Sequence, residues 1–244
     1  MAKNRPIIYS LLFACLGIFL CLVIIGLGLF VGTHLKKADD ATAVLNPSRA
    51  TIVIDAGHGG EDGGAVADDG TYEKTLNLEI SKALALICEL NGSEVRLTRD
   101  SDTLLYDYYD DLDNYTGQKK AYDLKNRLKI TNEHQNPIYV GIHMNKFSIP
   151  KYSGMQVYYS SNNEESINIA RQIKDTNKLY LQANNNRQIK RADSSIYILD
   201  KAKCPAVLVE CGFMSNANEL ALLKTKEHQL GIALVIFASI SNFT

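Results

Sequence analysis

Short β-prone runs alternate with stretches of helical periodicity along most of the chain. Strands are predicted at TIVIDA (51–56), EVRLTR (94–99), PIYVGIH (137–143), MQVYYS (155–160) and AVLVEC (206–211), which are short and rich in β-branched or aromatic residues. Between them, apolar residues recur at helical spacing over 74–90, over about 118–134 and from about Glu164 onward. This alternation requires right-handed crossovers and predicts an α/β fold, with a mostly parallel mixed sheet flanked by helices.

Two further segments are assigned by composition. A last helix is expected to start at Asn218, whose side chain can cap it. Its end, QLGIALVIFASI, is apolar on all sides and, at about 12 residues, is too short to span a membrane, so a buried core helix is expected. The acidic, tyrosine-rich segment 100–117 is predicted to be a surface loop, with a substrate-facing position as one option.

The N-terminal part has a different character, because residues 7–33 contain no charged side chain. As a helix this run would be about 40 Å long at about 1.5 Å per residue, enough for one transmembrane helix and longer than the apolar core of a cleavable signal peptide. We expect a membrane anchor at 1–33, a linker at 34–50 and one folded domain at 51–244. Each flank of the span carries two basic residues, so charge alone does not orient it.

Charge and cysteine usage exclude two classes of function. The first 50 residues hold five Lys/Arg and two Asp/Glu, which leaves 21 basic and 25 acidic residues in the folded domain. A basic surface for nucleic acid is therefore not expected. The five cysteines show no CxxC spacing, so they are predicted to be small buried apolar residues rather than a cysteine zinc site or a redox pair.

Polar residues collect where the predicted strands end. His58 follows the first strand within the glycine-rich run GHGGEDGG, His143 ends PIYVGIH, and Glu210 ends AVLVE. Glu73 begins the helix that follows the first strand. Because open α/β sheets bind ligands outside the carboxyl ends of their strands, these four side chains are expected to meet at one edge.

Each of the four also has a plainer interpretation. His58 or His143 can be a turn residue, Glu73 can complement a helix N-terminus, and a buried Glu210 can pair with a basic side chain. A carboxylate at the end of an apolar strand, however, costs desolvation energy unless it has a partner or a function. Two histidines, one glutamate and an open position are typical of catalytic zinc, which activates water near neutral pH. The other carboxylate can then accept the proton of that water; spacing alone leaves either glutamate as the ligand.

Four motifs taken in order resemble one enzyme family over about 51–240. DAGHGGEDGGA, Glu73 at a helix start, GIHMNK and VLVECGFMSNANE are together similar to the zinc-dependent N-acetylmuramoyl-L-alanine amidases of bacterial cell walls. The resemblance implies one Zn²⁺ per chain held by His58, Glu73 and His143, with Glu210 as the catalytic carboxylate. It also implies a phosphorylase/hydrolase-like fold and cleavage of the amide between the lactyl group of N-acetylmuramic acid and the L-alanine of the peptidoglycan stem peptide.

The chain departs from the family pattern at two positions. Ala56 replaces the usual proline of the first motif, and Lys146 stands where a small residue is commoner; neither is one of the four proposed site residues. Asn145, Arg99 and Arg127 occupy places where the family tends to keep polar residues. We take them as candidate groups that contact substrate or support the ligands.

A subclass is indicated by the anchor, the compact domain and the run YTGQKKAYDLKNRLKITNEHQNP (115–137), which resemble the sporulation-type amidases that prepare cortex muropeptides for muramic lactam formation. Segment 100–117 is too short and too acidic to be the helix that plugs the zinc in some relatives, so an open site is expected. The expected partners are peptidoglycan and, through the N-terminal helix, the membrane, with the domain on the cell-wall side.

Other classes of protein fit less well. A phosphate-binding loop is not indicated, since GHGGEDGG lacks GK[ST] and carries acids at 61 and 62 that would repel phosphate. A serine hydrolase is not indicated either, because no GxSxG occurs. The strongest rival is a non-catalytic wall-binding protein on the same fold, which would need to have lost a ligand or the base.

Overall fold

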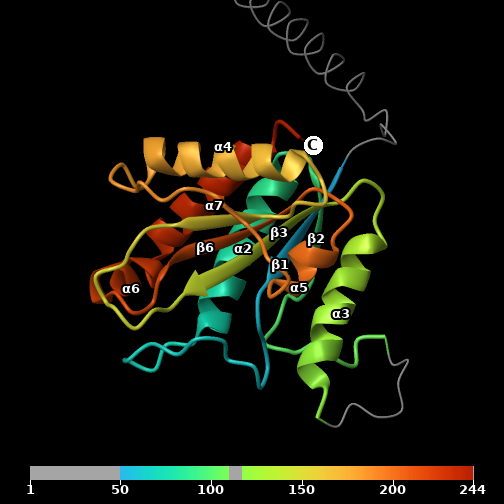
Figure 1. The fold of residues 1–244 in the computed structure, drawn as a ribbon, viewed down its shortest axis with the longest axis horizontal. Coiled ribbons are helices and arrows are strands. Elements are labelled where there is room, and N and C mark those ends of the chain that lie inside the picture. Colours follow the sequence, from blue (N-terminus) through green and yellow to red (C-terminus); the bar gives the residue numbers. More distant parts are fainter. Residues whose placement is uncertain (1–49, 110–116, 244) are drawn as a thin grey trace, which may run out of the picture. The chain divides into compact units, whose positions relative to one another are not determined.

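The computed structural model describes residues 50–109 and 117–243, whose strands form one mixed sheet (Figure 1). The strands are β1 (Thr51–Ala56), β2 (Glu94–Leu97), β3 (Ile138–Asn145), β4 (Gln156–Tyr159), β5 (Lys190–Arg191) and β6 (Ala206–Phe213). Their order across the sheet is β2-β1-β3-β6-β4-β5. All neighbours are parallel except β4 and β6, which are antiparallel, so the mostly parallel mixed sheet is confirmed.

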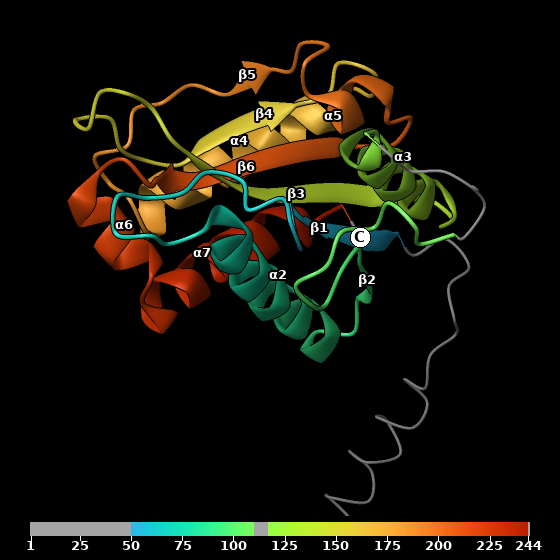
Figure 2. The same ribbon diagram turned by 90° about the horizontal axis from the view of Figure 1, so that it is seen from below.

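Helices cover both faces of this sheet (Figure 2). They are α2 (Glu73–Leu90), α3 (Lys119–Asn132), α4 (Glu165–Tyr180), α5 (Tyr197–Lys201), α6 (Ala217–Leu223) and α7 (Lys226–Ile240). The larger core joins α2, α4 and α7 to one face, while a smaller core lies under α3 and α5 on the other.

The central strands are apolar because both of their faces are buried. In β3, Ile138, Val140 and Ile142 enter the larger core, whereas Tyr139 enters the smaller one. Strand β6 divides its side chains in the same way. Alternate residues thus point to opposite cores, which explains why these strands have continuous hydrophobic runs rather than a polar face.

The single C-terminal helix expected from Asn218 is wrong, because two helices occupy this region. The side chain of Asn216 caps α6 by accepting from the Glu219 amide at 3.1 Å, and Thr225 caps α7 by accepting from the His228 amide at 3.3 Å. Helix α7 is also not buried on all sides, since Leu234 on its outer face is 48% exposed. Each cap starts its own helix, so the segment expected to form one helix forms two.

The helical spacing over about 118–134 marks a face of α3 that includes Leu124 and Thr131, of which only Thr131 is buried. Its apolar residue Leu124 is 37% exposed, and the buried side instead carries Asp123, Asn126 and Arg127. Arg127 forms ion pairs with Asp123 and Asp55, Asp123 accepts from a backbone amide, and Asn126 donates to a backbone carbonyl, so the burial of these polar groups is tolerated. Strand β5 and helix α5 were not predicted, because two and five residues are too short to show a period.

The membrane anchor and two of the five cysteines lie in the N-terminal part of the chain, before the described residues. The transmembrane span at 7–33 lies outside the described residues, as do Cys15, Cys21 and nearly all of the linker. Within 50–109 and 117–243, no helix is long and apolar enough to cross a membrane. Three cysteines in these ranges are buried free thiols, as predicted: Cys88, Cys204 and Cys211.

Candidate active site

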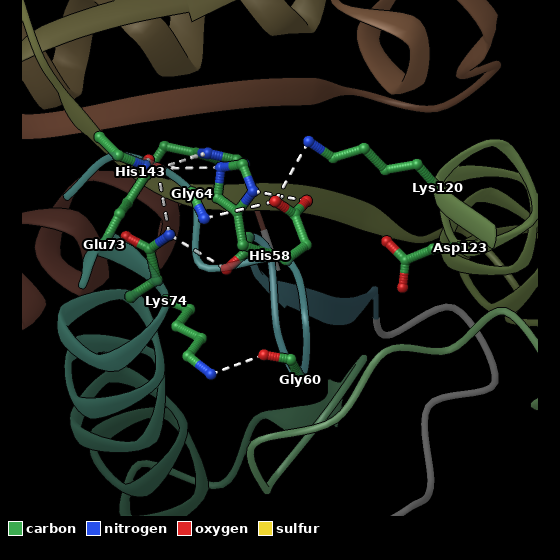
Figure 3. Close-up of polar contacts among 12 residues, drawn as sticks. His58, Gly60, Gly64, Glu73, Lys74, Lys120, Asp123 and His143 are labelled. Carbon is green, nitrogen blue, oxygen red and sulfur yellow. Dashed lines mark hydrogen bonds and ion pairs between the residues drawn. The ribbon is translucent and has the colours of Figure 1, made fainter. Parts of the chain in front are cut away.

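Three side chains from separate elements converge at the carboxyl edge of the sheet (Figure 3). His58 follows β1, Glu73 is the first residue of α2, and His143 lies in β3. One ligand atom from each lies within 4.8 Å of the others. Glu73 Oε1 is 3.3 Å from His58 Nε2 and 3.0 Å from His143 Nδ1. This cluster can hold a metal ion, so the donor set fits the ion that the sequence predicted.

The glycine-rich loop lets the first histidine reach this position. His58 itself adopts a left-handed backbone with φ 62°, which non-glycine residues rarely do. Gly64 has φ 66°, and a Cβ there would lie 2.6 Å from both Glu73 Oε2 and His58 Cδ2. Only glycine permits the backbone to pass this close to two of the three candidate ligands.

Glu73 is buried and held as an anion. Its Oε2 accepts from the Ala65 amide at 2.8 Å, and its Oε1 accepts from the Met144 amide at 3.1 Å. Burial by itself would raise the pKa of Glu73, but hydrogen bonds and the charges of His143 and His58 bring the pKa well below its ordinary value. A fixed carboxylate of this kind is suited to hold a cation.

Glu210 lies directly opposite His143 in the β3–β6 register. Its Oε2 is buried and has no hydrogen-bond partner among the described residues, nor does any lysine or arginine there form an ion pair with it. Burial raises the pKa of Glu210 to about 7. The site therefore contains one carboxylate whose hydrogen-bonding capacity is engaged and one whose capacity is free.

Comparison with known proteins identifies the family. The model of the N-acetylmuramoyl-L-alanine amidase family matches residues 52–242. The chain belongs to this family. It is 33% identical over 192 residues to the germination-specific N-acetylmuramoyl-L-alanine amidase of Bacillus subtilis (strain 168), covering 79% of this chain and 78% of that protein.

Solved structures agree with this membership. The CwlD amidase from Clostridioides difficile, in complex with the GerS lipoprotein, superposes with a TM-score of 0.73 and 38% identity, covering 80% of this chain and 98% of that one. The amidase AmiC2 of Nostoc punctiforme gives a TM-score of 0.66 and 28% identity, covering 80% and 96%. The α/β fold of this chain is therefore the amidase fold.

In this amidase an additional carboxylate, which the sequence analysis missed, orients the first histidine. Asp62 Oδ2 lies 2.9 Å from His58 Nδ1, and Lys120 is 3.1 Å from Asp62 Oδ1. Burial opposes ionisation, but the contacts with His58 and Lys120 hold the pKa of Asp62 below its ordinary value. Carboxylates commonly fix the ring and tautomer of a metal-binding histidine in this way. In the sequence, the one sign of this contact is that a carboxylate follows His58 by four residues.

Arg99 and Arg127 hold the backbone that carries His58. Arg99 donates to the carbonyls of Ala56 at 2.8 Å and of Gly57 at 3.0 Å. Arg127 donates to the carbonyls of Ala56 at 2.8 Å and of His58 at 2.7 Å. Both arginines are buried, at 3% exposure for Arg99 and 1% for Arg127. Of the two roles considered from the sequence, this placement favours support of the ligand loop over contact with substrate.

Two buried aspartates neutralise the positive charge of Arg127. Asp55 Oδ1 lies 2.5 Å from Arg127 Nη1, and Asp123 Oδ2 lies 2.8 Å from Arg127 Nε. Asp55 also accepts from the hydroxyls of Thr98 and Tyr139, each at 2.5 Å. Burial alone would raise the pKa of Asp55, yet Arg127 and these hydroxyls lower it. This network joins α3 to the end of β1.

Asn145, the remaining candidate, is the last residue of β3, after a register irregularity that follows His143. Its carbonyl accepts from the Met214 amide at 2.8 Å, while its side chain makes no hydrogen bond recorded within the described ranges. A hollow of about 250 Å³ is lined by His58 and His143, and also by Leu124 and Ile196. The amidase thus has space for a ligand next to the candidate metal cluster.

Proposed function

We propose that this amidase is a zinc hydrolase that cleaves the amide between the lactyl group of N-acetylmuramic acid and the L-alanine of the stem peptide. The observation that carries the proposal is the buried, unpaired carboxylate of Glu210 opposite His143, one of three clustered ligand side chains. Family membership supplies the reaction class.

The proposed zinc ligands are His58, Glu73 and His143. Two imidazole nitrogens and one carboxylate suit zinc, and three protein ligands leave one position open for catalysis. When bound, zinc would supply Lewis-acid chemistry, which makes water a stronger acid and an amide carbonyl a stronger electrophile. Asp62 would keep the ring of His58 in its ligand orientation through Nδ1.

Glu210 is the proposed proton carrier. Its free oxygen would take one proton from the attacking water, whose oxygen forms a new bond to the lactyl carbonyl carbon. The same proton would then pass to the amide nitrogen as the carbon–nitrogen bond breaks. The products are a lactyl carboxylic acid and the free amine of L-alanine, so every atom of the water is accounted for.

The setting of this activity is part of the proposal. We infer that residues 7–33 anchor the chain in a membrane, with the amidase domain on the cell-wall side, where peptidoglycan lies. A cortex role that prepares muropeptides for muramic lactam formation is supported by the similarity to a germination-specific amidase. A partner protein is included because the related CwlD amidase is in complex with a lipoprotein.

Hydrolysis distinguishes this function from non-catalytic wall binding. The full chain is incubated with purified peptidoglycan, and the soluble products are analysed by mass spectrometry. We expect free stem peptides and glycan strands with unsubstituted lactyl groups, while Glu210→Gln should release few or none. Binding to peptidoglycan without either product would show that the chain is a binder only.

A further inference from the structure

An arginine outside the site just described is fixed at the carboxyl end of β6. Arg187 belongs to the segment that leads from α4 to β5. Strand β5 is the edge strand of the sheet and lies beside β4 (Figure 2). Its guanidinium carbon is 4.4 Å from the centroid of the Phe213 ring and 5.8 Å from that of Tyr152. Its Nε donates to the Ser153 carbonyl at 2.8 Å. These three contacts hold the guanidinium in one place.

The terminal nitrogens of this guanidinium remain available. Neither Nη1 nor Nη2 of Arg187 has a recorded hydrogen bond or ion pair to the residues that the structure describes. The nearby carboxylate of Glu219 is engaged elsewhere, since it accepts from the amides of Gly154 and Phe213, each at 2.8 Å. A stacked arginine with two free, parallel donors is preorganised for a carboxylate, which accepts two hydrogen bonds from such a fork.

This cation lies close to the proposed reaction centre. Phe213, over which it stacks, pairs with Asn145 of β3, whereas Glu210 pairs with His143 two residues earlier, so Phe213 lies about 7 Å beyond Glu210 along the sheet. Tyr158 of β4 lies near enough to both groups to interact with their charges. Burial and the charge of Glu210 raise the pKa of Tyr158, and the charge of Arg187 opposes that rise.

Space for a ligand is present beside Arg187. A hollow of about 860 Å³ is bordered by Arg187, Tyr152 and several asparagines, among them Asn184, Asn185 and Asn186. Asn185 is engaged with Met155 and with the Arg187 amide, and Asn186 accepts from Lys178. The side-chain amide of Asn184 makes no hydrogen bond to the described residues, and such an amide can both donate to and accept from a peptide backbone. The hollow therefore combines one fixed cation with a free amide that suits an extended peptide.

We propose that Arg187 binds a carboxylate of the stem peptide. This inference rests on the proposed function and adds a subsite to it. An extended peptide covers about 7 Å in two residues, so the carboxylate belongs to a residue at least two positions beyond the scissile amide. Arg187 would thus select the acidic part of the peptide and align the amide with Glu210.

Two N-acetylmuramoyl peptides test the subsite, one with free carboxylates beyond the L-alanine and one with all of them converted to primary amides. The full chain should prefer the free acid by about 10- to 100-fold in kcat/KM, the range for charge-assisted hydrogen bonds. Arg187→Ala and Arg187→Gln should abolish this preference, and Arg187→Lys should retain part of it. Arg171→Ala, which removes an exposed arginine of α4, serves as the matched control and should keep the preference.

Two results would overturn the subsite: no preference in the wild-type chain, or an equal loss on both substrates in the folded Arg187 variants. If the wild-type chain hydrolyses neither substrate, the proposed function fails and calorimetry with the stem peptide alone decides the subsite. Binding of the free acid that is at least tenfold weaker in Arg187→Gln would then support it, and equal affinities would refute it.

Discussion

Two glutamates lie near the same pair of histidines but in opposite environments. Glu73 accepts hydrogen bonds from two backbone amides and contacts both histidines. Glu210 Oε2 has no hydrogen-bond partner among the described residues. The pKa of Glu73 is accordingly lowered and that of Glu210 is raised to about 7. Two carboxylates whose pKa values are shifted in opposite directions are suited to different tasks, one as a metal ligand and one as a proton carrier.

Conservative substitutions should separate these two tasks. Glu210→Gln keeps the shape of the side chain but cannot accept a proton, so turnover should fall by about 10²- to 10⁴-fold with zinc content near normal. Glu73→Gln removes the anionic ligand and should weaken zinc retention instead. Zinc stoichiometry and turnover are measured on both variants, with circular dichroism to show that both are folded. Metal loss in Glu210→Gln with metal retained in Glu73→Gln would exchange the two roles.

Sequence reasoning located the candidate site because its residues fall at strand ends. His58 follows β1, while His143 and Glu210 lie two and three residues before the ends of β3 and β6, because both strands extend beyond the predicted runs. A parallel sheet brings the carboxyl-terminal parts of its strands to one edge. It could not find the orienting contact of Asp62 or the free Nη atoms of Arg187. Both depend on side-chain directions within a folded loop, which a one-dimensional pattern does not contain.

Helix α3 acts as the support of the ligand loop. It places Arg127 between Asp55 and Asp123, and the same guanidinium reaches the carbonyls of Ala56 and His58. Since the loop that carries His58 depends on these bonds, the packing of one helix and the geometry of one candidate ligand are linked.

Removal of that arginine should therefore affect stability and the site together. Arg127→Met leaves two buried carboxylates without their cation, so the free energy of unfolding should fall by about 3–5 kcal/mol. Zinc affinity should also decrease in the fraction that remains folded. Lys125→Met is the matched control, because Lys125 is exposed on the same helix, and it should change stability by no more than about 0.5 kcal/mol. Urea denaturation of both variants, followed by circular dichroism, measures the difference; equal stabilities would show that the network is dispensable.

For the whole molecule, the alternation of strand-like and helix-like patterns predicted the order of the elements. It did not predict how each helix packs against its neighbours. The long elements α2, α4 and the central strands were predicted within a few residues. The break between α6 and α7 depends on the caps at Asn216 and Thr225, and the second cap lies in the polar run 224–228 at the junction of the two helices. The polar buried side of α3 depends on Asp55, which is 72 residues away from Arg127 in the chain.

Membrane topology is a further prediction at this scale. If residues 7–33 form an anchor with the N-terminus in the cytoplasm, residues 34–244 lie outside the membrane. A protease added to intact protoplasts should then digest a tag at the C-terminus, while a cytoplasmic protein stays protected as the control. Digestion of the tag only after lysis would place the domain on the opposite side.

The candidate ligands come from segments far apart in the chain, with Glu73 and His143 separated by 70 residues. A parallel sheet must pair before they meet, and such long-range pairing is slow compared with local contacts. An unfolded chain therefore offers no preformed chelate, and nearly all of the binding energy of the ion belongs to the native state. The melting temperature should accordingly rise with free zinc concentration by the full linkage relation. A metal ion held by these three residues would therefore mark a chain whose sheet has already formed.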